Sequence, residues 1–304
     1  MNTIDDLLKL QSYQILNKIS GGASSVEKYL LLKNGEKYLL RLYDARFMNG
    51  RYEAFKYASQ LYSSGISVPK IYDVGKLDDK VHGYSIIEWI EGVSLDKLLI
   101  SDTLCEKYGA LSGGELLKVH QLNKDNSVDI YQKYIDSVFK KIKKIERLDV
   151  KINLDDVYKF ILNESTILKD RPTSIIHGDF HPGNIVLKED KIYFIDLDVC
   201  KKDYAWIDLS TNACNMDFPK FYVSSIKEYF DNNIPNDFWI IYNLYGILYC
   251  LDYILYCMRI DGKTLEDGIR QMQEFLNYTD NFSSLQPDWF NDKKIRKERL
   301  KWEN

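Results

Sequence analysis

The sequence lacks the features that mark exported, disulfide-stabilised and zinc-binding proteins. Its 304 residues include only five cysteines, and no two of them form a C-x-x-C pair. An odd number of scattered thiols suits a reducing compartment better than a disulfide framework or a zinc site. The first residues are acidic and have neither the basic start nor the apolar run of a signal peptide. We therefore expect a cytoplasmic protein.

An excess of basic charge is also missing. The chain has 41 basic and 45 acidic residues, which gives a formal net charge of -4. This balance suits phosphate backbones poorly, so we expect no nucleic-acid partner. The apolar run 238–258 has the length of a membrane span, but Asn243 and Asp252 lie inside it. Because a central aspartate costs roughly 2.5–3.5 kcal/mol on insertion scales, we interpret the run as a buried helix and expect no membrane partner.

Apolar side chains, in contrast, are plentiful. Hydrophobic residues make up 45% of the sequence, which is enough for a large core, and the length suits two lobes. Before residue 92 the pattern predicts an antiparallel sheet with one helix. The expected strands are residues 13–19, 26–33, 37–43, 71–76 and 84–90, and the expected helix is 50–64.

After residue 92, helical periodicity dominates. It covers residues 95–100, 108–122, 127–147 and 154–168 and the part from 206 onward, with short apolar runs between 174 and 197. We therefore predict an α+β chain with a sheet-containing lobe at residues 1–91 and a larger, mostly helical lobe at residues 92–304.

Polar residues with a clear chemical meaning stand beside short apolar runs near residue 180. Asp179 and Asn184 lie on one loop, and Asp196 follows the apolar run 192–195. A loop and a small hairpin can fold these three side chains into one cluster. Aspartate and asparagine oxygens are ligands that Mg²⁺ accepts, and the ion keeps its other positions for water and phosphate. Asp179 would then be free to receive a hydroxyl proton.

The segment 177–184 reads His-Gly-Asp-Phe-His-Pro-Gly-Asn and is followed by Ile195-Asp196. It resembles the signature of the aminoglycoside phosphotransferase and choline kinase-like superfamily, a His-Gly-Asp-x-His-x-x-Asn loop followed by an Ile-Asp strand end. Members are small-molecule kinases with the protein-kinase fold. The resemblance implies a bilobal kinase-like fold, with a nucleotide-binding lobe at residues 1–91 and a catalytic and acceptor-binding lobe at residues 92–304. It also implies Mg²⁺-dependent transfer of the γ-phosphoryl group of ATP, or of GTP, to a hydroxyl of a small molecule.

The resemblance also implies roles for individual residues. Asp179 would be the catalytic base or hydroxyl orienter, and Asn184 and Asp196 would hold Mg²⁺ on the nucleotide phosphates. The two histidines of the loop are interpreted as structural. Asp198 lies two residues past Asp196, where it either assists the metal or caps a turn.

Residues upstream fit a nucleotide site in the same family. A glycine turn between the first two strands would let the backbone approach phosphates; it contains Ser20, Gly21, Gly22, Ser24 and Ser25. Arg41 on the third strand and Glu53 on the helix would correspond to the Lys–Glu ion pair of kinases, with arginine replacing lysine. Lys37, on the same strand face, is the alternative phosphate contact. The strand end at Glu88 and Ile90 would offer backbone groups to the purine.

The acceptor is predicted at the run 238–258. Asp252 falls on the same helix side as Tyr249 and Tyr256, and aromatic faces beside an acid suit a cationic, hydroxylated molecule. A plain core helix is the alternative. An aminoglycoside-type antibiotic, and so antibiotic resistance, is the first choice; choline or another amino alcohol, a sugar and a macrolide stay open. The rival from another class is a catalytically silent nucleotide-binding module that acts through protein interactions.

Overall fold

The computed structural model describes residues 8, 12–19, 26–77, 81–148, 152, 154–214, 217–260 and 262–291. The chain divides into two compact units. The first contains residues 1–98 and 177–201, and the second contains residues 99–176 and 202–304. The segment that carries the predicted catalytic residues is therefore grouped with the N-terminal sheet, whereas a functional boundary after residue 91 stays a prediction.

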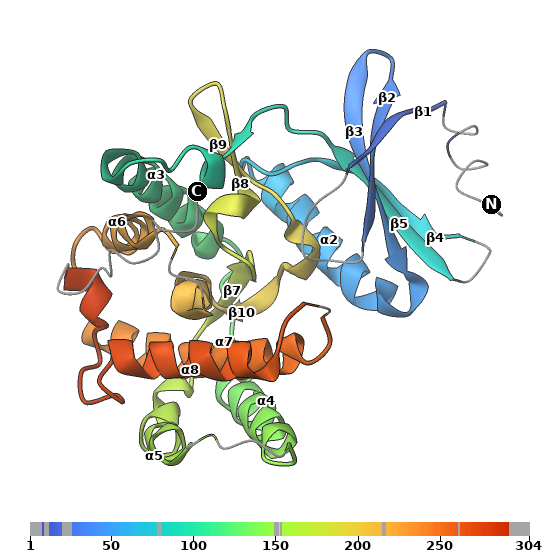
Figure 1. Ribbon diagram of the computed structural model, residues 1–304. Coiled ribbons are helices and arrows are strands. Elements are labelled where there is room, and N and C mark those ends of the chain that lie inside the picture. Colours follow the sequence, from blue (N-terminus) through green and yellow to red (C-terminus); the bar gives the residue numbers. More distant parts are fainter. Residues whose placement is uncertain are drawn as a thin grey trace. The chain divides into compact units, whose positions relative to one another are not determined.

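The first unit is built on the predicted five-stranded antiparallel sheet (Figure 1). Its strands are β1 (Gln14–Ile19), β2 (Glu27–Lys33), β3 (Glu36–Asp44), β4 (Ile71–Lys76) and β5 (His82–Glu88), in the order β1-β2-β3-β5-β4. Asn34 and Gly35, both with positive φ, connect β2 to β3. Two such residues match the twist of the strands that they join, which makes the hairpin tight.

Helix α2 (Met48–Ser63) follows β3 through a short 3₁₀ turn, η1 (Ala45–Phe47). Asp44 caps this turn by accepting a hydrogen bond from the backbone N–H of Arg46 at 2.9 Å. The helix buries Ala54, Phe55 and Ala58, which follow helical spacing, and it contacts η5 (Leu197–Val199). It therefore lies beside the strand end that carries the predicted metal ligands.

The segment 177–201 adds a small second sheet to this unit. Strands β8 (Ile185–Lys188) and β9 (Lys191–Phe194) form a hairpin, and β6 (Val93–Ser94) pairs with β8. The short 3₁₀ helices η2 (Leu95–Lys97) and η4 (Pro182–Asn184) contact each other beside it. The hairpin sets where the loop before β8 and the strand end after β9 can lie.

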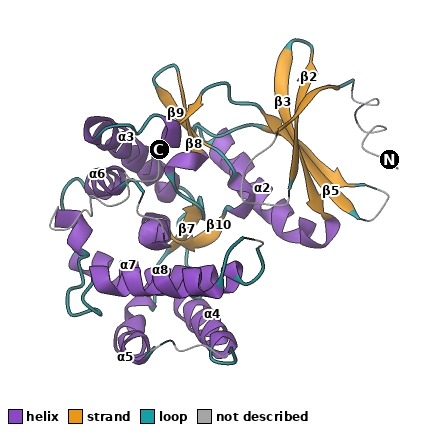
Figure 2. Cartoon of the chain, in the orientation of Figure 1, coloured by secondary structure: helices purple, strands orange, loops and turns teal. Residues whose placement is uncertain are grey.

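The second unit is mainly helical (Figure 2). Its helices are α3 (Asp102–Gln121), α4 (Ile130–Ile145), α5 (Asp155–Glu164), α6 (Pro219–Tyr229), α7 (Asn236–Cys257) and α8 (Leu265–Tyr278). Strands β7 (Thr173–Ile176) and β10 (Lys201–Tyr204) pair, and the 3₁₀ helices are η3 (Ser165–Leu168), η6 (Ala205–Cys214) and η7 (Asp288–Asn291). The predicted α+β class is confirmed.

Helix α7 occupies the run that has the length of a membrane span. Among the described residues it is the one helix with the length and apolar composition to cross a membrane, and 72% of that stretch is buried within the protein. Tyr242 and Tyr245 are buried, and the hydroxyl of Tyr134 donates to the carbonyl of Leu244 at 2.9 Å. These contacts are those of a core helix, in line with the sequence-based interpretation. A cytoplasmic location stays a prediction.

Candidate active site

Two histidines hold the loop between β7 and β8 in shape. The Nε2 of His177 lies 2.9 Å from the carbonyl oxygen of Ile195, and its Nδ1 accepts a hydrogen bond from the backbone N–H of Asp179 at 3.2 Å. Both contacts suit a neutral ring with its hydrogen on Nε2. The Nδ1 of His181 accepts from the N–H of Gly183 at 3.1 Å. Both rings are therefore used structurally.

Gly178 lets the chain turn directly before the predicted catalytic aspartate. Its φ is +86°, and a Cβ at this position would lie 2.7 Å from the carbonyl oxygen of Val199. Only glycine adopts this conformation without strain, and only glycine leaves room for that carbonyl. The residue therefore fixes the direction in which Asp179 leaves the loop.

Asp179 and Asn184 are in direct contact. The Nδ2 of Asn184 donates to Oδ2 of Asp179 at 2.8 Å and to its backbone oxygen at 3.0 Å. The Asp179 side chain is 53% exposed, whereas Asn184 is buried. Nε2 of His181 lies 3.6 Å from the same Oδ2. One carboxylate oxygen is thus oriented by the loop, and the group is open enough to accept a proton from a bound hydroxyl.

The β8–β9 hairpin places Asp196 next to this pair along the backbone. Ile185 pairs with Phe194, and the N–H of Ile195 donates to the carbonyl oxygen of Asn184 at 2.9 Å. Asp196 follows with φ of 62°, in the left-handed region that aspartate tolerates. The structure therefore brings Asp179 and Asn184 together and puts Asp196 on the adjoining strand end. Their chemical roles stay predictions.

Four charged residues form a cluster at this strand end, which we call the arginine clamp: Arg41, Arg51, Asp196 and Asp198. Nη1 of Arg41 lies 2.6 Å from Oδ1 of Asp196 and 2.7 Å from Oδ1 of Asp198. Nη1 of Arg51, on α2, lies 2.7 Å from Oδ2 of Asp198 and donates to its backbone oxygen at 3.0 Å. The side chains of Arg41 and Asp198 are each 4% exposed. The clamp is therefore a largely buried ion-pair network.

The expected ion pair between Arg41 and Glu53 is wrong for this structure: no such contact exists among the described residues, and the partners of Arg41 are Asp196 and Asp198. Glu53 is exposed, because it lies two positions after Arg51 on α2 and so points from a different side of the helix. Lys37, the alternative phosphate contact, bonds Glu91 at 2.6 Å. Sequence reasoning missed Arg51. The signal that could have found it is a cation on the helix after the strand of Arg41, which can pair with the second acid, Asp198.

For both acids of the clamp, burial raises the pKa and Arg41 lowers it. Burial raises the pKa of Asp198 to about 6, although Arg41 acts to lower it. Burial also works against ionisation of Asp196, but Arg41 outweighs this effect and holds the pKa of that carboxyl well below its usual range. Asp198 is still mostly ionised at neutral pH, but Asp196 keeps its charge down to a lower pH and is therefore the better ligand for a cation.

The donor atoms fit a magnesium ion at Asn184 and Asp196. Asn184 contacts Asp179 through its Nδ2, and Asp196 contacts Arg41 through its Oδ1, so the Oδ1 of Asn184 and the Oδ2 of Asp196 are not used in those two contacts. Both carboxylate oxygens of Asp198 accept from arginines, and its expected metal role stays a prediction. Within the described part of the chain, no three His, Cys, Asp or Glu residues are grouped to hold a metal. Two protein ligands remain compatible with Mg²⁺, which keeps water and phosphate oxygens as its other ligands.

Only some of the residues predicted to contact the nucleotide belong to the described part of the chain. Ser20, Gly21, Gly22, Ser24 and Ser25 lie outside the described residues. The N–H of Glu88 donates to the carbonyl oxygen of Lys70 at 2.8 Å, and its carboxylate accepts from the N–H of Lys70 at 3.0 Å. Ile90 is buried just beyond. Backbone contacts from Glu88 and Ile90 to a purine stay predictions.

The residues predicted to bind the acceptor lie on α7, in the second unit. Asp252 is 54% exposed, and its Oδ1 lies 3.5 Å from Nζ of Lys141 on α4. The rings of Tyr253 and Tyr256 stack with centroids 6.1 Å apart, and Tyr249 is half-buried. Lys141 offsets part of the charge that would attract a cation. The acceptor role of Asp252, Tyr249 and Tyr256 stays a prediction.

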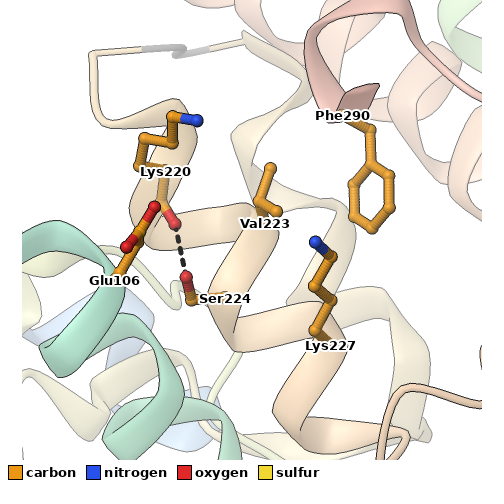
Figure 3. A pocket seen from close by; sticks show the side chains of 6 residues that line it. All are labelled: Glu106, Lys220, Val223, Ser224, Lys227 and Phe290. Atoms are coloured by element: carbon orange, nitrogen blue, oxygen red, sulfur yellow. Dashed lines mark hydrogen bonds between the residues drawn. The ribbon is translucent and has the colours of Figure 1, made fainter. Parts of the chain in front are cut away.

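A pocket of about 280 Å³ opens in the second unit (Figure 3). It is lined by Glu106, Lys220, Val223, Ser224, Lys227 and Phe290. Within it, the hydroxyl of Ser224 donates to the backbone oxygen of Lys220 at 2.9 Å. None of the predicted site residues lines this pocket, so it is not the candidate active site.

Solved structures share this fold at low sequence identity. A thermostable mutant of aminoglycoside phosphotransferase APH(4)-Ia is 14% identical, with a TM-score of 0.66, over 90% of this chain and 98% of that chain. A Haemophilus somnus protein assigned as a fructosamine-3-kinase is 13% identical, with a TM-score of 0.64, over 90% and 96%. LicA in complex with AMP is 18% identical, with a TM-score of 0.65, over 92% and 96%. These likenesses confirm the predicted kinase-like fold.

The family is identified by the sequence itself. No curated protein sequence matches the chain. Residues 15–231 match the phosphotransferase enzyme family. This match includes the sheet, the loop with Asp179 and Asn184, and the strand end with Asp196. Because it covers most of the 304 residues, the chain belongs to the phosphotransferase enzyme family.

Proposed function

We propose that this phosphotransferase is a Mg²⁺-dependent kinase that transfers the γ-phosphoryl group of ATP to a hydroxyl of a small molecule. The observation that carries the proposal is the contact between Asp179 and Asn184 beside Asp196. An oriented, solvent-accessible carboxylate next to two oxygen donors for a cation is the arrangement that phosphoryl transfer needs.

In this proposal Asp179 accepts a proton, and the other residues of the site position the reacting groups. The acceptor hydroxyl oxygen would form a bond to the γ-phosphorus while the bond from that phosphorus to the bridging oxygen of ADP breaks. Asp179 would take the hydroxyl proton, with Asn184 holding one of its oxygens in place. The protein does little covalent chemistry in such a reaction, so the positions of these groups determine the rate.

Asn184 and Asp196 would hold the magnesium ion through the oxygens that they do not use toward Asp179 and Arg41. When bound, the ion supplies charge neutralisation for the phosphate oxygens. ATP is supported by solved structures of the same fold, since APH(4)-Ia has been captured with ADP and with AMP-PNP, and LicA with AMP. GTP is the alternative nucleotide.

An aminoglycoside-type antibiotic is the acceptor that we propose first. The support is the likeness to APH(4)-Ia, whose nucleotide complexes also contain hygromycin B, together with the acid and tyrosines on the outer side of α7. The likeness to a protein assigned as a fructosamine-3-kinase supports another acceptor class, a small sugar-like or amino-alcohol metabolite. The fold serves both.

A phosphate-transfer screen tests the function. The wild-type protein, radiolabelled ATP and Mg²⁺ are incubated with aminoglycosides, macrolides, choline and sugars, and labelled products are separated. We expect label on at least one acceptor, with the highest turnover on an aminoglycoside. Label on choline or a sugar alone would replace the aminoglycoside assignment. Expression in a sensitive host should raise aminoglycoside tolerance, and unchanged tolerance across a broad panel removes the resistance role.

The silent nucleotide-binding module is the second candidate, favoured by one observation. Arg41 forms an ion pair with Oδ1 of Asp196, so one oxygen of a proposed metal ligand already has a partner. The module predicts tight nucleotide binding without hydrolysis or transfer. Slow Mg²⁺-dependent ATP hydrolysis by the wild-type protein, lost in Asp179→Ala, decides against it.

A further inference from the structure

The arginine clamp differs from the ion pair found in kinases in the charge that the helix contributes. In that arrangement a strand cation pairs with a helix glutamate. Here the strand cation, Arg41, pairs with Asp198 in η5, which follows β9, and helix α2 contributes a second cation, Arg51, to the same acid. Asp198 therefore takes the place of the helix glutamate, and Arg51 is the extra charge that balances the cluster.

One aromatic ring supports both guanidinium groups. Cζ of Arg51 lies 4.8 Å and Cζ of Arg41 lies 5.7 Å from the centroid of the Tyr43 ring. Tyr43 is buried, and its hydroxyl lies 3.0 Å from Oγ of Ser85 on β5. Cations are attracted to such a face, more so where water is excluded. The positions of the arginines are thus set by the sheet as well as by the acids.

Arg51 fixes both the side chain and the backbone of Asp198. The same Nη1 reaches Oδ2 at 2.7 Å and the backbone oxygen at 3.0 Å. Oδ1 of Asp198 is left for Arg41, whose Nη1 it shares with Asp196. If Asp196 turns to a metal ion, Asp198 remains as the anchor of Arg41. Without Arg51, Asp198 would have a bare oxygen and would be free to turn toward the metal instead.

We propose that Arg51 is a positioning residue of the nucleotide site: through Asp198 it holds Arg41 where the nucleotide phosphates bind. This inference rests on the proposed function, because it needs a nucleotide at the site. It assigns Asp198 to arginine binding and leaves Asn184 and Asp196 as the metal ligands. Arg51 itself touches neither substrate nor metal.

Nucleotide binding without metal separates this role from catalysis. The dissociation constant for ATP is measured by calorimetry in EDTA for the wild-type protein and for Arg51→Met, Arg51→Lys and Asp198→Asn. We expect Arg51→Met to weaken binding at least about tenfold, since one partner of a buried charge pair is lost. Arg51→Lys should recover part of that loss. Arg46→Met is the matched control, because Arg46 also pairs with an aspartate, Asp44, but is 82% exposed; binding should not change.

A double variant tests whether the effect passes through Asp198. Since Arg51 acts on Arg41 only by way of Asp198, Arg51→Met combined with Asp198→Asn should bind ATP no more weakly than the weaker single variant. Additive losses contradict the proposal. So does Arg51→Met that binds ATP as tightly as the wild-type protein, even if it melts at a lower temperature. If Arg51→Met does not fold, Arg51→Gln is judged by the same criterion.

The controls also separate this inference from the function on which it rests. A wild-type protein that binds no nucleotide removes the proposed function and this role with it. A wild-type protein that binds and transfers phosphate, beside an Arg51→Met variant of equal affinity, removes the role of Arg51 alone.

Discussion

The catalytic loop and the arginine clamp belong to the same unit of the protein, but they are held together differently. In the loop, most bonded residues are two to five positions apart, as in Asn184 and Asp179, and His177 and Ile195 are 18 positions apart. In the clamp, Arg41 and Asp196 are separated by 155 positions. A short motif specifies the loop almost completely, whereas the clamp depends on which charged residues the fold brings together.

Exposure differs in the same way. Asp179 is 53% exposed, and Asp198 is 4% exposed. An exposed, oriented carboxylate can meet a substrate, while a buried one between two arginines mainly affects stability and geometry. We therefore expect a change at Asp179 to reduce turnover with little loss of stability, and changes in the clamp to reduce stability and nucleotide binding.

The largest expected effect is on catalysis by Asp179→Asn. Removal of the proton acceptor should lower kcat about 10²- to 10⁴-fold. The affinity for ATP and the melting temperature should stay near the wild-type values, because the side chain is half exposed and asparagine has nearly the same shape. Steady-state kinetics and calorimetry measure the three quantities. A variant with wild-type kcat contradicts the assignment of Asp179 as the base.

A charge deletion in the clamp should have the largest effect on folding. Asp198→Asn leaves Arg41 and Arg51 facing a neutral amide, and breaking such a buried pair typically costs about 3–5 kcal/mol of unfolding free energy. Urea denaturation followed by circular dichroism measures the loss. Asp190→Asn, in the exposed turn of the same β8–β9 hairpin, is the matched control and should change little. Equal effects of the two substitutions would mean that the clamp does not stabilise this unit.

Gly178 and Gly35 both have a positive φ, so substitutions at the two positions distinguish the cost of backbone strain from the cost of a close contact. Gly178 has φ of +86° and Gly35 has φ of +82°, but only at Gly178 does a carbonyl oxygen occupy the space of a Cβ. Alanine should cost about 1–2 kcal/mol at Gly35 from the left-handed backbone alone. The cost at Gly178 should be larger, and kcat should fall as Asp179 shifts. Equal costs in denaturation and unchanged kcat would show that the contact with Val199 does not set the loop.

The smallest expected effect on stability lies in the second unit, at Asp252. The Asp252 side chain is 54% exposed and lies 3.5 Å from Lys141, so Asp252→Asn should change the unfolding free energy by no more than about 0.5 kcal/mol. If this acid attracts a cationic acceptor, the KM for that acceptor should rise severalfold while the KM for ATP does not move. A KM for the acceptor that matches the wild-type value removes Asp252 from the acceptor site.

Much of the fold could be predicted because its signals are local. Alternating apolar residues and the Asn34-Gly35 turn predict β2 and β3, and helical spacing around Phe55 predicts α2. For the pair formed by β7 and β10, the sequence predicts only the apolar strand β7, since β10 is four residues long and largely polar. Its pairing comes from the surrounding unit and not from its own sequence.

For the candidate site, local spacing was informative and long-range pairing was not. The contact between Asp179 and Asn184 follows from a separation of five positions and a proline-containing turn. Glu53 and Arg51 are both charged and both on α2, and only the direction in which each points decides which one meets the strand end. Analogy with the kinase ion pair favoured Glu53, which is the wrong residue. The analogy predicts which charges pair in kinases, but it does not predict which side chains of α2 point toward the strand end in this chain.

The central claim is that Asp179 accepts the proton of an acceptor hydroxyl during transfer of the γ-phosphoryl group of ATP. Phosphorus NMR of the wild-type protein with ATP, Mg²⁺ and the acceptor found by the screen tests it directly. We predict one phosphomonoester for each ADP formed, and almost none with Asp179→Asn. ADP accompanied only by inorganic phosphate, or equal phosphomonoester formation by the variant, would contradict the account.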